Sequence, residues 1–122
     1  MIARDADEQQ LASIRDAIEM WSQVAAIQLS MSEDGRPLPI VFEESKLFLG
    51  FYDDEAEVIR IARRVNEQRP RAVVLAHELG HAFNLFHVDD RDSVMNEGNW
   101  TIPPLEADAQ ALEAEWGPCV HR

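Results

Sequence analysis

The sequence has little cysteine, few basic residues and no long apolar run. Its single cysteine, Cys119, excludes an internal disulfide and any zinc site that needs two or more thiolates from this chain. Lysine and arginine number 11 against 23 acidic residues, which gives a net charge of −12. Nucleic acids and anionic membranes both bind a basic face, so we expect neither as a partner. No run approaches the ~18 apolar residues of a transmembrane helix.

The length and the overall composition are those of one globular domain. A chain of 122 residues can bury a core of its own, and its residues are 46% hydrophobic and 28% charged. We expect one domain over residues 1–122 and a monomer. The first residues contain no apolar signal-peptide core. The protein is therefore expected to be cytoplasmic if the recorded N-terminus is native, and secreted if a signal or pro-segment was removed.

The hydrophobic pattern predicts an α+β fold. Helical spacing of apolar residues predicts an amphipathic helix over residues 7–25. Strands are predicted at 27–31, 39–43, 47–52 and 57–63, with turns at 33–37 and 53–55. Pro70 can begin a second helix, apolar on most faces, over about 71–83, and a C-terminal helix is predicted at about 105–116. We therefore expect a small twisted mixed β-sheet of about four strands packed on two long helices, followed by an irregular region and a C-terminal helix.

The second predicted helix carries the sequence His77-Glu78-Leu79-Gly80-His81. Residues four apart lie on one helix face, about 40° apart around the axis and ~6 Å along it, so two imidazoles can converge on one metal ion. Glu78 lies about 100° from His77 around the axis, at the edge of the same site. This is the HExxH pattern of zinc peptidases, in which the glutamate is the general base.

A third ligand is needed, because a catalytic zinc takes three protein ligands and keeps one position open for water. On a continuous helix His87 would lie ~15 Å beyond His77 and about 80° off its face. His87 can therefore contribute only if the helix ends after His81 and the chain turns back. Such an ending needs a left-handed residue, for which asparagine is second only to glycine, and Asn84 stands where the break is required.

In these residues the chain resembles the metzincin clan of zinc endopeptidases, whose signature is HExxHxxGxxH followed by a Met-turn. The three histidines and Glu78 match its spacing, and Asn84 stands where the family usually has glycine. Ser93-Val94-Met95-Asn96 matches the Met-turn, with Met95 eight residues after His87, as in catalytic domains of the matrix-metalloproteinase type. The family usually has a strand before its first helix, which only residues 1–4 could supply here. The resemblance implies a single, minimal catalytic domain with Met95 in a hydrophobic floor beneath the metal ligands.

The resemblance also implies a function. His77, His81 and His87 would hold Zn²⁺, and Glu78 would be the general base for a zinc-activated water that hydrolyses peptide bonds. A peptide or protein substrate would lie extended along the strand at 47–52. The opposite wall would come from residues 96–103, where Trp100 and Ile102 could line a pocket for an apolar side chain.

Two alternatives remain open at this point. In the first, the third ligand is an acid on the last helix, such as Glu106, as in gluzincin-type peptidases. That choice leaves His87, Asn84 and Met95 without a role. In the second, the chain keeps the fold and binds zinc but is a scaffold or interaction domain without proteolytic activity. An intact Glu78 argues against the scaffold, since a non-catalytic domain has no physical need for that carboxylate.

Overall fold

A computed structural model describes residues 2–25 and 38–116. The chain forms β1 (Ile2–Arg4), α1 (Glu8–Val24), β2 (Pro39–Glu43), β3 (Gly50–Asp53), β4 (Val58–Ala62), α2 (Gln68–Ala82) and α3 (Glu106–Trp116). The predicted fold class is confirmed: it is α+β, with a small mixed sheet and two long helices. None of the helices in the described ranges has the length and apolar composition needed to cross a bilayer.

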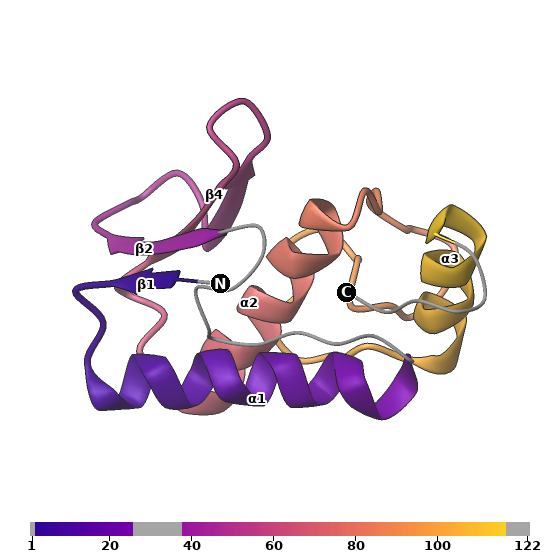
Figure 1. The fold of residues 1–122 in the computed structure, drawn as a ribbon, viewed down its shortest axis with the longest axis horizontal. Coiled ribbons are helices and arrows are strands. Elements are labelled where there is room, and N and C mark those ends of the chain that lie inside the picture. Colours follow the sequence, from indigo (N-terminus) through magenta and orange to yellow (C-terminus); the bar gives the residue numbers. More distant parts are fainter. Residues whose placement is uncertain (1, 26–37, 117–122) are drawn as a thin grey trace.

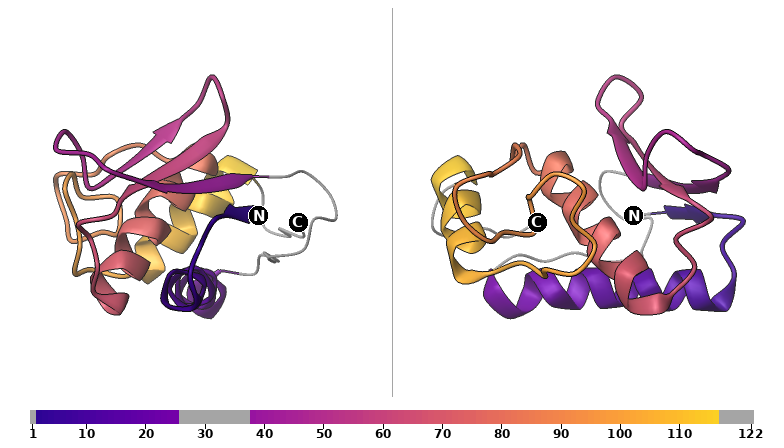
Figure 2. Two further views of the ribbon diagram at one scale, coloured as in Figure 1. Left: turned by 90° about the vertical axis from the view of Figure 1, so that its left-hand side faces the viewer. Right: turned by 180° about the vertical axis from the view of Figure 1, so that it is seen from behind.

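The four described strands form one sheet in the order β1-β2-β4-β3. β2 pairs parallel with both β1 and β4, whereas β3 pairs antiparallel with β4 and lies at the edge. The three residues of β1 provide the strand that only the chain's first residues could supply. In Figure 1 the sheet lies above, α1 runs along the bottom, and α2 crosses between them. Figure 2 shows the irregular segment 84–103 between α2 and α3.

α1 begins and packs as its sequence predicts. The Asp7 carboxylate accepts a hydrogen bond from the Gln10 amide, and the Gln10 side chain accepts one from the Asp7 amide, which satisfies two helix-terminal donors. The predicted apolar face is buried at Ile14 and Trp21, and the Trp21 indole donates to the Ala76 carbonyl of α2 at 2.9 Å. This contact joins the two long helices at the centre of the core.

α2 is the central element of the fold, because every residue from 71 to 80 is buried. The helix contacts α1 on one side and strands β3 and β4 on the other. It begins at Gln68, three residues before the predicted start, with Pro70 in its first turn. Proline is tolerated there because the first amides of a helix have no partner within the helix.

The edge strand differs most from the prediction. β3 begins at Gly50 rather than at residue 47, and Leu47 is 95% exposed. The Arg64 guanidinium donates to the carbonyls of Ser45 and Phe48, which holds the preceding residues as a loop. The predicted strands at 39–43 and 57–63 correspond to β2 and β4, and residues 84–103 contain neither helix nor strand. The strand at 27–31 and the turn at 33–37 lie outside the described residues.

Candidate metal centre

α2 presents His77 and His81 one turn apart on the face that lies under β3. Their rings are nearly perpendicular, with centroids 4.8 Å apart. The Nε2 atoms of the two rings are 3.2 Å apart. The helical spacing of the motif therefore produces the convergence that the sequence predicted.

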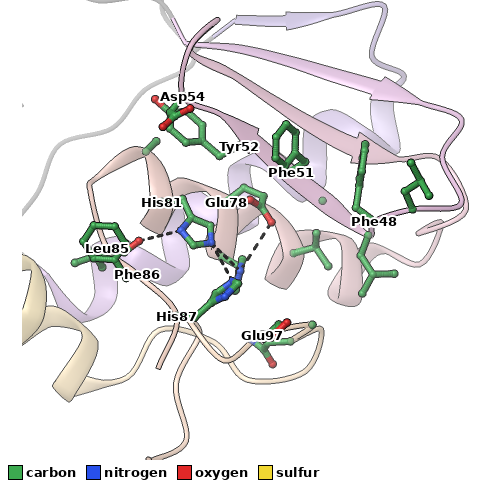
Figure 3. Close-up of a pocket in the computed structure, with 18 of the residues that line it drawn as sticks. Phe48, Phe51, Tyr52, Asp54, Glu78, His81, Leu85, Phe86, His87 and Glu97 are labelled. Carbon is green, nitrogen blue, oxygen red and sulfur yellow. Dashed lines mark hydrogen bonds and ion pairs between the residues drawn. The ribbon is translucent and has the colours of Figure 1, made fainter. Parts of the chain in front are cut away.

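The end of α2 brings in the third histidine. Asn84 has a φ of 73°, the left-handed conformation expected at a helix break, and its amide donates to the His81 carbonyl. The Leu85 amide then donates back to the Gly80 carbonyl, so the chain reverses. As a result, Nε2 of His87 lies 3.3 Å from Nε2 of His81 (Figure 3).

Hydrogen bonds on the far side of two rings determine which nitrogen faces the centre. Nδ1 of His77 lies 2.7 Å from the Val94 carbonyl oxygen, and Nδ1 of His81 lies 2.9 Å from that of Leu85. A carbonyl can only accept, so each Nδ1 carries the proton and each Nε2 of a neutral ring carries a lone pair. A proton on Nε2 of His87 could make a hydrogen bond to Nε2 of His81. The Nε2 lone pairs of His77 and His81 would still point at each other across 3.2 Å. A cation between the nitrogens removes that repulsion, so the donor set fits a metal ion.

Burial keeps two of the three ligands in the form that binds metal. His77 is buried, His81 is half-buried and His87 is exposed. Burial lowers the pKa of His77 to about 4, and it also lowers the pKa of His81. Both rings are therefore neutral near pH 7, as metal coordination requires. Three imidazole nitrogens suit zinc and several other transition metals, so the donor set supports a metal site without selecting the metal.

Glu78 places a carboxylate beside this centre. Its Oε2 atom lies 3.9 Å from Nε2 of His77, and because that ring is neutral the contact is not an ion pair. Burial raises the pKa of Glu78 to about 7, against a smaller opposing effect of a hydrogen bond from the Tyr52 backbone. A carboxyl group with this pKa can both accept and release a proton near neutral pH.

Gly50 allows the edge strand to lie directly over Glu78. A Cβ atom at Gly50 would lie 2.7 Å from Cγ1 of Val74 and 3.0 Å from Oε2 of Glu78. A side chain at this position would therefore push β3 away from α2 or displace the carboxylate. The absence of a side chain permits the close approach that encloses Glu78.

These groups form the floor of a cavity of about 860 Å³. Figure 3 shows Phe51 and Tyr52 above Glu78, His81 and His87, and Phe48 to the right of Glu78. The other wall comes from residues 84–87 and from Glu97, Gly98 and Asn99. Apolar rings and a few convergent polar groups are typical of a ligand-binding site.

Trp100 and Ile102 do not line this cavity in the described structure. Trp100 is 54% exposed, and the backbone of Ile102 is hydrogen-bonded to the Asn99 side chain. Their role in binding an apolar side chain stays a prediction. Glu106, the alternative third ligand, is exposed at the start of α3 and is not part of the histidine cluster, which is the group of metal-ligand type found among the described residues.

Met95 packs against α2 at Gly80. It is 1% exposed, and its sulfur lies so close to Gly80 that a Cβ atom there would clash with it. Gly80 stands between His77 and His81 on α2, so Met95 supports the helix segment that carries both ligands. The role of Met95 in a hydrophobic floor beneath the metal ligands stays a prediction.

Two asparagine side chains hold the irregular segment in place through hydrogen bonds that the sequence did not predict. Asn96 donates to the carbonyls of Val88 and Arg91, and Asn99 donates to those of Val94 and Ile102. Side chains do this work because a segment without helix or strand must satisfy its backbone groups in other ways. The frequent Ser and Asn residues at 93–99 were a signal that could have identified this network.

Comparison with known proteins adds no family to this geometry. No protein-family model matches the chain, and none of the curated proteins is significantly similar to it.

Proposed function

We propose that the protein is a zinc-dependent endopeptidase of the metzincin type. The observation that carries this proposal is the convergence of three histidine Nε2 atoms beside the buried Glu78 carboxylate in one cavity. Three neutral imidazoles and an adjacent carboxylate are the parts that hydrolysis at a metal centre requires. Zinc held by the three histidines would supply a Lewis acid that lowers the pKa of a water molecule and polarises a peptide carbonyl.

Glu78 would carry the proton in this reaction. Its carboxylate accepts a proton from the attacking water and returns it to the leaving amide nitrogen. Burial raises the pKa of Glu78 to about 7, so both transfers are accessible near neutral pH. The neutral state of His77 and His81 keeps their Nε2 lone pairs available to the metal.

β3 would bind the substrate as an added antiparallel strand. It is the edge strand of the sheet and lines the cavity directly above Glu78. An extended peptide can pair with the backbone of an edge strand, which binds many sequences while presenting one peptide bond to the floor. The exposed Phe51 and the adjacent Phe48 would contact apolar substrate side chains.

The substitution Glu78→Gln tests the catalytic proposal. Gln keeps the shape of the side chain but cannot accept the proton, so cleavage of an unfolded protein substrate should fall by at least about 100-fold. Zinc content should stay unchanged, because Glu78 is not a ligand. Glu97→Gln is the matched control, since it removes another carboxylate that lines the cavity.

Equal cleavage by the wild type and Glu78→Gln would contradict the peptidase assignment. Zinc bound in the wild type without any cleavage would favour the non-proteolytic scaffold.

The ligand set is tested by His87→Ala against Glu106→Ala. Loss of one of three nitrogen ligands should abolish stoichiometric zinc binding, whereas removal of the exposed Glu106 carboxylate should leave it intact. For both variants, atomic absorption after dialysis measures the zinc bound per protein chain. Zinc retained by His87→Ala and lost from Glu106→Ala would support the gluzincin-type alternative.

A further inference from the structure

A buried acid on α3 is connected to the metal centre through the loop at 93–95. Asp108 is 1% exposed and Ser93 is completely buried. Neither residue contacts the cavity, and the proposed reaction makes no use of them. Burying a carboxylate is costly unless it is fully hydrogen-bonded, so the bonds that Asp108 makes are informative.

The connection is a chain of short hydrogen bonds that runs in one direction. The Ser93 hydroxyl donates to Oδ1 of Asp108 at 2.6 Å. The Met95 amide donates to the same hydroxyl oxygen at 2.8 Å. That amide belongs to the peptide group whose oxygen is the Val94 carbonyl, and this carbonyl accepts from Nδ1 of His77 at 2.7 Å.

Every link in this chain is polarised in the same sense. The negative charge of Asp108 makes the Ser93 oxygen a better acceptor, which polarises the Val94–Met95 peptide group and makes its carbonyl a stronger acceptor for His77. A stronger acceptor at Nδ1 increases the electron density at Nε2 of the same ring. Groups that bond the far nitrogen of a metal-binding histidine set its orientation and donor strength in this way.

We propose that Asp108, Ser93 and the Val94–Met95 peptide group form a hydrogen-bond relay that orients His77 and strengthens its Nε2 atom as a metal donor. The proposal rests on the proposed function, because it assigns a role in holding zinc. Asp108 and Ser93 are positioning residues, since they act through His77 and touch no substrate. The side-chain amide of Asn99, which donates to the same Val94 carbonyl at 3.1 Å, holds that carbonyl in place.

His81 provides a comparison inside the molecule. Its Nδ1 donates to the Leu85 carbonyl at 2.9 Å, and none of the hydrogen bonds of the described residues joins that carbonyl to a carboxylate. A change in the relay should therefore affect His77 and leave His81 unchanged. A general loosening of the fold would affect both rings.

Ser93→Ala breaks the relay with the least other damage. Asp108 keeps its hydrogen bonds from the amides of Val94 and Leu105 and its ion pair with Arg91. The matched control is Ser13→Ala. Ser13 is also completely buried, and its hydroxyl donates to the Gln68 carbonyl and accepts from Arg71, away from the cavity.

The experiment measures zinc affinity with a competing chelator at one pH, and the ¹⁵N shifts of both histidines in the zinc-loaded protein. Ser93→Ala should weaken zinc binding by about tenfold and shift Nδ1 of His77 but not of His81. Ser13→Ala should change neither, and Ser93→Thr, which restores the hydroxyl, should recover the wild-type His77 signal.

Equal zinc affinities in Ser93→Ala and Ser13→Ala would overturn the relay, as would equal shifts at His77 and His81. The two proposals can fail separately. If the wild type binds zinc and Ser93→Ala weakens that binding, but no peptide is cleaved, the peptidase proposal fails and the relay stands. If the wild type cleaves peptides and Ser93→Ala leaves zinc affinity unchanged, the relay alone fails.

Discussion

At the scale of single residues, the candidate site depends on burial acting in opposite directions on neighbouring groups. Desolvation lowers the pKa of His77 to about 4 and raises that of Glu78 to about 7. Both shifts favour the neutral form, because burial removes the water that would stabilise the charged form. The same desolvation therefore prepares a metal ligand and a proton carrier on adjacent residues of one helix.

These shifts predict a pH dependence for the chelator-treated protein. Between pH 4.5 and about 7 the folded state binds more protons at Glu78 than the unfolded chain, so this group makes the free energy of unfolding fall as pH rises. Between about pH 4 and pH 6.5 the unfolded chain binds more protons at His77 than the folded state, so this group makes the free energy of unfolding rise as pH rises. In the wild type the two contributions largely offset each other.

Glu78→Gln should remove one of these contributions. We expect urea unfolding of the chelator-treated variant to give a stability gain on the order of 2 kcal/mol over wild type at pH 8, and no gain at pH 4. The control is Glu97→Gln, which removes an exposed carboxylate that lines the same cavity. A gain of the same size at both pH values would contradict this account.

At the scale of elements, the end of α2 decides whether the third histidine reaches the other two. Asn84 adopts a left-handed conformation, and its side-chain amide donates to the Glu115 carboxylate of α3. One residue therefore terminates the helix and also connects it to α3. The family signature has glycine here, which would supply the backbone conformation but not the side-chain contact.

Asn84→Gly and Asn84→Ala separate these two roles. Both variants lose the bond to Glu115, but only alanine pays about 1 kcal/mol for a left-handed backbone. The free energy of unfolding of Asn84→Ala, measured in urea, should therefore be lower than that of Asn84→Gly by about 1 kcal/mol. Asn84→Ala should also bind zinc more weakly, because His87 is displaced. Equal stabilities would mean that the chain reverses without the left-handed residue.

At the scale of the whole molecule, the metal centre adds a second link between α2 and the irregular segment, which Leu85, Val94 and Met95 already join to the core. His77 and His81 belong to α2, which the sheet and α1 surround, whereas His87 belongs to the irregular segment 84–103. A bound ion would link that segment to the buried helix. Any ligand that binds only the folded state also stabilises it by mass action.

Metal removal should therefore loosen this segment first. We expect a chelator to lower Tm, and zinc at 100 times its Kd to restore about 2.7 kcal/mol of stability. Limited proteolysis of the chelated protein should cut within 84–103 before α1 or α2. The variant His87→Ala should have the low Tm of the chelated protein with or without added zinc. If zinc does not change the Tm of the wild type, the metal centre is contradicted.

The sequence by itself determined the features that depend on local geometry. Helical periodicity located α1, and Pro70 with the apolar residues after it located α2. The spacing of His77 and His81 placed both rings on one face, and the distance to His87 required a break near Asn84. Each inference needs only the pitch of a helix or the backbone preference of one residue. The strands predicted at 39–43 and 57–63 correspond to β2 and β4.

Only the tertiary structure decided what depends on partners distant in the chain. The start of β3 depends on Arg64 holding the loop before it, and the proton positions on the histidines depend on carbonyls of Val94 and Leu85. Asp108 has no motif around it, and its connection to His77 exists because α3 packs behind the loop at 93–95. Most of these hydrogen bonds join residues that are distant in the chain, so no local pattern in the sequence could reveal them.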